Sequence, residues 1–208
     1  MSSRAVEFWF DFASTYSYPA AMTLRQAAEA RGVEVIWRPF LLGPIFGDLG
    51  WTDSPFNLQP AKGRYMWRDL ERVCDSAGLP FQRPPGFPQR SVDAAKVALA
   101  GLQEDWGEDF IRAVFHVQFA DGYDIAHDAT LERALYATIG RHPDVMAVRL
   151  QEILAGPSDL RAHTEEARDR GIFGAPTYFA GTEMFWGYDR QDAAIDWAAT
   201  QSNQGDQE

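Results

Sequence analysis

The pattern of apolar and polar positions predicts a β-α-β unit at the start of the chain. Residues 6–12 read VEFWFDF, which is aromatic, β-branched and too short for a helix, so a buried strand is expected. A helix is expected over 16–31 and a second strand over 33–37, and such a unit should be parallel and right-handed. Residues 41–56 are punctuated by glycine and proline and are predicted to form a loop.

The rest of the chain is helical over a long stretch and then returns to strands. Strands are expected at 177–180 and 183–186, joined by a turn, and a last helix is expected from Asp189. Two β-bearing ends that are each too small to fold alone should join into one central sheet, with the helices inserted between them. The helices expected in the middle cover 61–77, 91–102, 108–120, 128–139, 144–154 and 158–170.

The composition is that of a globular protein, with 46% hydrophobic and 24% charged residues. A length of 208 residues suits one domain, or one domain with a large insertion. The net charge of −11 argues against a nucleic-acid partner, because non-specific binding to phosphates needs a basic surface. The sequence has no run of 18 apolar residues and no basic leader before an apolar run, so we expect a cytoplasmic protein without a membrane partner.

Residues that carry redox or metal chemistry are scarce. Cys74 is the single cysteine, so no intrachain disulfide can form, and its place on an amphipathic helix predicts a buried packing role. The four histidines show neither an HExxH pattern nor Cys/His ligand spacing, so no metal site is expected. Asp11 ends the first strand, where a structural hydrogen-bonding role is favoured over acid–base chemistry.

Ser14 stands where the first strand turns into the first helix. The backbone N–H groups at a helix start are unpaired and carry a partial positive charge, so they stabilise an anion. The Ser14 hydroxyl is therefore a donor placed where a thiolate or a carboxylate would be stabilised. The alternative is an ordinary N-cap, a role that serine often fills, and the local sequence alone favours it.

The second informative stretch is GIFGAPTY, residues 171–178. Pro176 comes directly before a strand and cannot donate to the sheet at its own nitrogen, which leaves an exposed backbone edge. A cis peptide bond between Ala175 and Pro176 would make that edge a docking strip for an extended peptide. An isolated Ala-Pro bond is usually trans, so this stretch carries little weight by itself.

Together the two stretches resemble the thioredoxin-like fold, whose oxidoreductases carry Cys-x-x-Cys where this chain has Ser14-Thr15-Tyr16-Ser17. The closer resemblance is to the 2-hydroxychromene-2-carboxylate isomerases, which belong with the kappa-class glutathione transferases in the DsbA-like branch. It implies an α/β protein with a thioredoxin-like domain over 1–56 and 171–208, a large all-helical insertion over 57–170, and a homodimer. The matching segments are FDFASTYSY (10–18), RPFLLG (38–43), Asn57 with Lys62, YMWRDLER (65–72), FGAPT (173–177) and MFWGYDR (184–190).

The resemblance assigns roles to the residues that match the family's motifs. Ser14 matches the catalytic hydroxyl that stabilises the glutathione thiolate, and Ala175 with cis-Pro176 matches the segment that pairs with the cysteinyl backbone of glutathione. The segment that grips the γ-glutamyl end matches Trp186, Gly187, Tyr188 and Asp189. The physical reason is that Asp189 would meet the ammonium group while N–H groups opening the last helix meet the carboxylate. An N-cap role for Asp189 is the alternative, and the two roles are compatible.

Three further residues are implied to bind substrate. Asn57 and Lys62 match positions that help to bind the carboxylates of substrate or glutathione, although a lysine on a helix is otherwise a solvated side chain. Arg90 stands where the family often has asparagine, and it is a second candidate for the substrate carboxylate. The chain also departs from the family at Thr15, where proline is common, and at Pro19, where leucine is usual.

The resemblance implies a glutathione-dependent isomerase that acts on small aromatic carboxylates of the 2-hydroxychromene-2-carboxylate type. A first alternative is a kappa-like glutathione transferase or peroxidase that uses the same thiolate against an electrophile or a peroxide. A second alternative is a non-catalytic thioredoxin-like module that binds extended peptides at the Pro176 edge. Affinity for glutathione separates both enzymes from the binding module, and turnover without consumption of glutathione separates the isomerase from the transferase.

Overall fold

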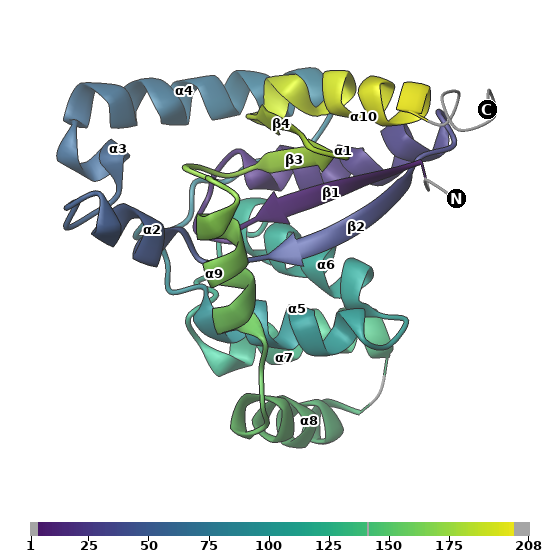
Figure 1. Cartoon of the computed structure of the whole chain (residues 1–208). Helices are drawn as coiled ribbons and strands as arrows, with labels where there is room; N and C mark the ends of the chain where they lie inside the picture. Colours follow the sequence, from purple (N-terminus) through teal and green to yellow (C-terminus); the bar gives the residue numbers. More distant parts are fainter. Residues whose placement is uncertain (1–3, 141, 202–208) are drawn as a thin grey trace.

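The computed structural model describes residues 4–140 and 142–201, and it joins the two β-rich ends of the chain in one sheet. The strand order is β2-β1-β3-β4 (Figure 1). Strands β1 (Ala5–Phe10) and β2 (Glu34–Pro39) are parallel, as the β-α-β pattern predicts. Strand β3 (Thr177–Ala180) pairs antiparallel with β1, and β4 (Glu183–Trp186) pairs antiparallel with β3.

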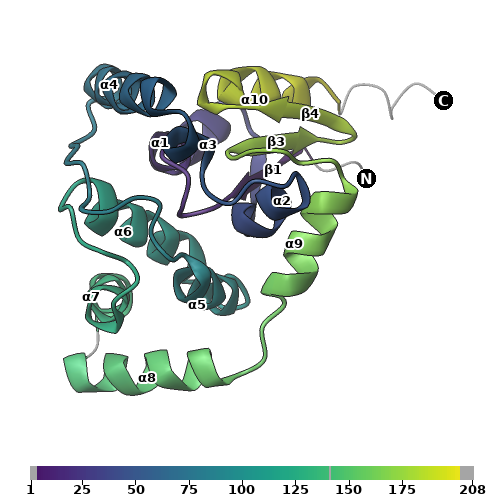
Figure 2. The ribbon, with the colours of Figure 1, turned by 90° about the vertical axis from the view of Figure 1, so that its left-hand side faces the viewer.

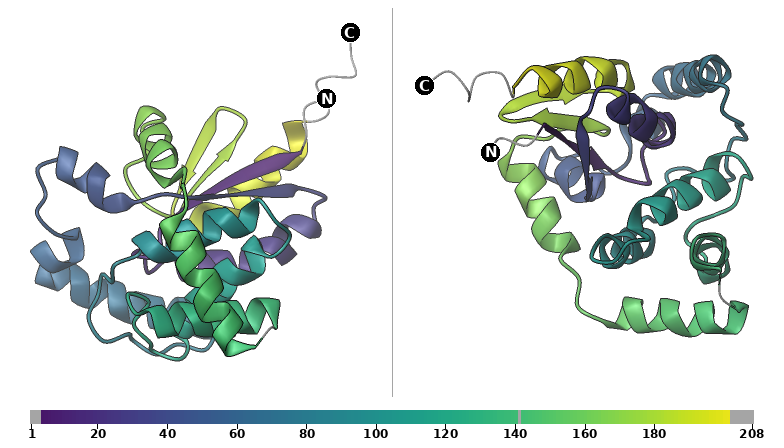
Figure 3. Two further views of the ribbon diagram at one scale, coloured as in Figure 1. Left: turned by 90° about the horizontal axis from the view of Figure 1, so that it is seen from below. Right: turned by 90° about the vertical axis from the view of Figure 1, so that its right-hand side faces the viewer.

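The helices of the middle region lie within a few residues of their predicted positions. Figures 2 and 3 show α8 at the end of the molecule that is farthest from α4 and α10. The helices are α1 (Ser17–Glu29), α2 (Leu42–Asp48), α3 (Pro55–Leu58), α4 (Pro60–Ala77), α5 (Val92–Leu102), α6 (Gly107–Phe119), α7 (Asp128–Ile139), α8 (Pro143–Ala155), α9 (Leu160–Asp169) and α10 (Gln191–Thr200).

The prediction of a loop over 41–56 is wrong, because this stretch contains the short helix α2 and the start of α3. Pro44 lies in the first turn of α2, where a missing N–H costs no intrahelical hydrogen bond. Leu42 and Ile45 of this helix are buried three residues apart, so tertiary packing stabilises a helix that glycine and proline disfavour locally.

The two faces of the sheet bury different clusters of side chains. Val6, Phe8 and Phe10 alternate along β1 and join the main core, which continues into helices α5 and α6. The ring of Phe115 on α6 lies 4.8 Å from that of Phe12 and 5.9 Å from that of Phe10. On the other face a smaller cluster comprises Trp9, Phe40, Leu42, Ile45, Ala167, Ile172 and Phe179.

The helical region and the sheet share buried side chains. The main core passes from the sheet into the helices within one cluster of buried residues. Helix α9, which falls inside the predicted insertion over 57–170, contacts β2 and contributes Ala167 to the core on the second face. The thioredoxin-like fold with inserted helices is confirmed, whereas the domain boundaries at 57 and 171 stay a prediction.

Candidate active site

The turn that follows β1 places Ser14 against the other end of the chain. The N–H of Ser14 donates to the carbonyl of Asp11 at 2.9 Å, and α1 begins only at Ser17. The residue at the N-cap position is Tyr16, whose side chain makes no capping hydrogen bond. The N-cap role for Ser14 is therefore wrong: its hydroxyl, 7% exposed, donates to the carbonyl of Ala175 at 2.7 Å.

The segment before β3 forms the opposite wall of this site. The peptide bond between Ala175 and Pro176 is cis, as the resemblance implies. Gly187 N–H donates to the carbonyl of Pro176 at 2.9 Å, which ties this segment to the residues after β4. The sheet pairing of β1 with β3 thus brings together two stretches that lie at opposite ends of the sequence.

A cavity of about 370 Å³ opens above Ser14 and Ala175. Lys62, on α4, lies in its wall with its Nζ 5.8 Å from the centre of the Phe56 ring. The rest of the lining is mostly apolar and aromatic, so the cavity suits an aromatic ring beside a polar group. The aromatic side chains in this lining are Tyr16, Phe46, Trp51, Phe56, Tyr65, Phe173 and Trp186.

A second, more polar cavity of about 260 Å³ lies beside the first and shares Tyr16, Ala175 and Trp186 with it. The predicted γ-glutamyl segment lines this cavity, since it includes Trp186, Gly187, Tyr188 and Asp189. Asp189 lies inside a short 3-10 helix (Tyr188–Arg190), and Arg190 holds the N-cap position of α10, so the N-cap alternative for Asp189 is wrong.

Close packing keeps the shared wall in place. A Cβ on Gly174 would overlap the indole nitrogen of Trp186, so the absence of a side chain at Gly174 lets the indole lie on the backbone. The Trp186 ring also meets Phe173 at a centroid distance of 4.9 Å in an edge-to-face arrangement. Trp186 is still 53% exposed, which leaves one face of its ring to a bound molecule.

The structure adds Tyr16 and Asp69 to the site, and neither was singled out from the sequence. The Tyr16 hydroxyl donates to Asp69 at 2.8 Å, and Arg72 donates to the same carboxylate at 2.9 Å. Burial and the Asp69 hydrogen bond both raise the pKa of Tyr16, so its hydroxyl stays protonated. Both residues fall inside segments that carry the family resemblance, which was the available signal.

The three predicted substrate-binding residues have different surroundings. Lys62 reaches the Ser14 cavity, as described above. Asn57 is exposed and donates to both carboxylate oxygens of Asp53 at 3.1 Å and to the Phe87 carbonyl at 3.4 Å, so it ties two loops together. Arg90 lines a different cavity and pairs with Asp93 at 2.6 Å.

Two other titratable side chains are buried. Burial raises the pKa of the Cys74 thiol to about 12, so this residue packs in the core, as predicted, and is not a nucleophile at neutral pH. Asp11 is 3% exposed and accepts hydrogen bonds from the N–H groups of Ala13 at 2.9 Å and Leu42 at 2.7 Å. This is the structural role that the sequence favoured, yet burial also raises the pKa of Asp11.

Comparison with known proteins places this geometry in a family. The family model described as the DSBA-like thioredoxin domain matches residues 5–196. The chain belongs to the DSBA-like thioredoxin domain family. In this family member the turn that carries Ser14 faces the cis-proline segment.

Individual relatives carry the names of particular enzymes. The chain is 29% identical to a 2-hydroxychromene-2-carboxylate isomerase of Sphingobium xenophagum, over 91% of this chain and 95% of that protein. It is 25% identical to glutathione S-transferase kappa 2 of Caenorhabditis elegans, over 83% and 79% of the two chains. A solved 2-hydroxychromene-2-carboxylate isomerase superposes with a TM-score of 0.79 at 23% identity, covering 96% of this chain and 98% of the other. The resemblance inferred from the sequence is thereby confirmed.

No helix within 4–140 and 142–201 is long and apolar enough to cross a bilayer. In the same ranges, no group of three or more His, Cys, Asp or Glu side chains is arranged to hold a metal ion.

Proposed function

We propose that this chain is a glutathione-dependent isomerase of aromatic hydroxy acids of the 2-hydroxychromene-2-carboxylate type. The observation that carries the proposal is the Ser14 hydroxyl at 2.7 Å from the carbonyl of Ala175, a residue that lines both the aromatic cavity and the second cavity, which we call the acidic cavity because Asp69 and Asp189 line it. Relatives named as isomerases of such a compound and as kappa glutathione transferases support it.

The residues present fit the chemistry of glutathione, which is a small peptide with a thiol, an ammonium group and two carboxylates. The half-buried backbone of Ala175 would pair with its peptide groups, and Asp69 with Asp189 would meet the ammonium group. Lys62 is available to a carboxylate from the neighbouring cavity. Ala175 lines both cavities, so the two acidic side chains and the lysine are available to different ends of one peptide bound there.

The Ser14 turn would lower the pKa of a bound thiol. Among the described residues no backbone acceptor is found for the N–H groups of Thr15 and Tyr16, and both groups precede the first turn of α1. Such unpaired donors and the partial positive charge of the helix start stabilise an anion. The Ser14 hydroxyl can rotate from the Ala175 carbonyl to a thiolate, because a hydroxyl hydrogen turns toward the stronger acceptor.

When bound, glutathione supplies a thiolate that adds reversibly to a conjugated carbon, so that a carbon–carbon double bond becomes single and can rotate. The chain's own part is to hold the ring of the substrate against Phe46, Trp51 and Phe173 in the Ser14 cavity. Lys62 or Arg90 would pair with the substrate carboxylate. We also expect a homodimer in the cytoplasm, where the glutathione pool is reduced.

A kappa-like glutathione transferase is the second candidate, favoured by the relative at 25% identity. It would use the same thiolate but consume it. The non-catalytic peptide-binding module is less well supported, because the relatives that match most of the chain are named as isomerases and glutathione transferases.

The test is a glutathione titration of the wild type and of Ser14→Ala, with ultraviolet difference absorbance to follow the thiolate. We expect saturable binding and a thiolate band that weakens in the variant. An assay of ring opening then measures whether glutathione is conserved, as in an isomerase, or consumed, as in a transferase. Absence of binding at millimolar glutathione contradicts both enzyme candidates.

A further inference from the structure

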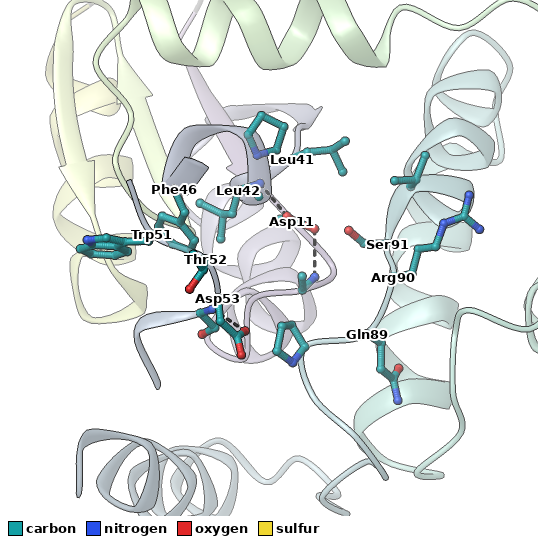
Figure 4. Close-up of a pocket in the computed structure, with 16 residues that line it drawn as sticks. Asp11, Leu41, Leu42, Phe46, Trp51, Thr52, Asp53, Gln89, Arg90 and Ser91 are labelled. Carbon is teal, nitrogen blue, oxygen red and sulfur yellow. Dashed lines mark hydrogen bonds between the residues drawn. The ribbon is translucent and has the colours of Figure 1, made fainter. Parts of the chain in front are cut away.

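A cavity of about 320 Å³ lies on the far side of the Ser14 turn, and the proposed function does not yet use it. It contacts the Ser14 cavity through a common wall made of Ala13, Leu42, Phe46, Trp51 and Ser54. Figure 4 shows Asp11 at the centre of this third cavity, between the start of α2 and the loop that leads into α5. The two cavities therefore adjoin each other, with Ser14 in the wall of one and Asp11 in the wall of the other.

The carboxyl of Asp11 is held in the wall without a partner of opposite charge. Its two oxygens each accept one backbone N–H, from Ala13 and from Leu42, so each oxygen retains a second lone pair. The Ser91 hydroxyl faces the carboxyl from the α5 side (Figure 4). Among the described residues no ion pair to Asp11 is found, and no other acidic side chain is as buried.

Few other charged groups face this carboxyl. Arg90, from the loop before α5, lies in the same wall but is largely exposed and paired with Asp93. Asp53, from the loop before α3, is exposed. Helix α2 contributes no charged side chain to the wall, and on the α9 side the Thr164 hydroxyl accepts from the N–H of Leu41. Burial thus dominates the environment of Asp11 and raises its pKa, while the N–H groups of Ala13 and Leu42 and, to a smaller extent, the Ser91 hydroxyl lower it.

We propose that the Asp11 cavity receives the hydroxyl-bearing carbon of the substrate ring, and that the Asp11 carboxyl carries the proton that moves when the ring opens. This inference rests on the proposed function. In a 2-hydroxychromene-2-carboxylate, one carbon bears the hydroxyl, the carboxylate and the ring oxygen. Ring opening moves a proton between two oxygens of that carbon, so a carboxyl that faces them can serve both.

The step balances without a further reagent. The Asp11 carboxylate takes the proton of the hydroxyl as the bond between the carbon and the ring oxygen breaks. The electron pair of that bond leaves on the ring oxygen, and the former hydroxyl oxygen becomes a ketone. Asp11 then returns the proton to the ring oxygen, which becomes a phenol. No atom is gained or lost, and no oxidant or reductant is required.

The experiment measures kcat for ring opening at saturating glutathione from pH 4 to pH 8, after subtraction of the uncatalysed rate. Because the carboxylate form takes the first proton, kcat of the wild type should fall as the pH drops through the pKa of Asp11. Ser91→Ala removes a hydroxyl that faces the carboxyl and lowers this pKa, so the fall should move to higher pH. Ser158→Ala, an equal deletion beside α9 and away from all three cavities, should leave the profile in place.

Asp11→Asn should lower kcat by about 100-fold or more and abolish the fall at low pH, while glutathione binding stays unchanged. A fall that stays at the same pH in Ser91→Ala contradicts the proposal for Asp11, as does an Asp11→Asn variant that retains wild-type kcat. If the wild type opens the ring with glutathione and only these shifts are missing, the proposed function stands and the Asp11 proposal fails. If the wild type neither binds glutathione nor opens the ring, both fail.

Discussion

The Ser14 cavity and the Asp11 cavity share a wall but are built in different ways. Around Ser14, which is itself buried, the wall of the cavity reaches solvent, since Lys62 is exposed and Trp186 is 53% exposed. Around Asp11 the carboxyl is 3% exposed and is fixed by two backbone N–H groups. The first arrangement suits reversible binding of a charged peptide, and the second suits control of a proton, since burial shifts a pKa and exposure leaves binding groups free.

The largest expected effect tests the Ser14 side of this comparison. Ser14→Ala should lower kcat/KM for ring opening by about 100-fold to 1,000-fold, the range for loss of one preorganised donor to a developing anion. Ser17→Ala is the matched control, because the Ser17 hydroxyl is buried on the same turn and has no hydrogen-bond partner among the described residues. The measurement is kcat/KM for ring opening in the two variants, from steady-state kinetics. Equal losses in both would mean that packing of the turn, rather than the Ser14 hydroxyl, matters.

A smaller effect is expected at the acidic cavity. Asp189→Asn should raise the dissociation constant of glutathione by about threefold to tenfold, because a carboxylate this exposed is screened by water. The value of kcat at saturating glutathione should not change. Calorimetric titration is the measurement, with Asp192→Asn as control, since Asp192 is also exposed and paired with an arginine but lines none of the three cavities. A similar loss of affinity in the control would point to net charge rather than to contact.

Within the Ser14 cavity, Lys62 can pair with a carboxylate of the aromatic acid or with one of glutathione. Lys62→Ala should raise either the KM of the aromatic acid or the dissociation constant of glutathione by about twofold to fivefold, which identifies the carboxylate that it binds. Arg64→Ala is the control, because Arg64 is exposed on the same helix and lines none of the three cavities. If neither constant changes relative to this control, Lys62 is a solvated lysine.

The smallest signal is in the stability of the fold and comes from the Asp11 side. Because the folded-state pKa of Asp11 lies above its ordinary value of 3.8, its stabilising contribution is fully present below that value and is lost as the pH rises through the folded pKa. The loss is about 1.4 kcal/mol for each unit by which the pKa is raised. The stability advantage of the wild type over Asp11→Asn should therefore shrink between pH 4 and pH 8.

Denaturant unfolding at a series of pH values measures this advantage without reference to turnover. Asp53→Asn makes the same chemical change at an exposed residue of the same cavity and serves as the control. An advantage that stays constant or grows with pH would mean that burial does not dominate the environment of Asp11.

The sequence by itself determined the strands, the long helices and the two stretches that form the candidate site. The aromatic run at 6–12 is too short for a helix and buries its apolar side chains in a strand. Pro176 marked the start of the strand that pairs with it. It did not determine α2, because glycine and proline disfavour a helix there and only the burial of Leu42 and Ile45 stabilises one.

Tertiary structure decided which polar groups share a cavity. Ser14 and Ala175 are 161 residues apart, and only the pairing of β1 with β3 brings the hydroxyl to the carbonyl. In the same way, the carboxyl of Asp11 meets the N–H of Leu42 because β1 and β2 end side by side. Local patterns fix the conformation of each segment, whereas burial, and with it the pKa of a carboxyl, depends on segments that meet only in the folded chain.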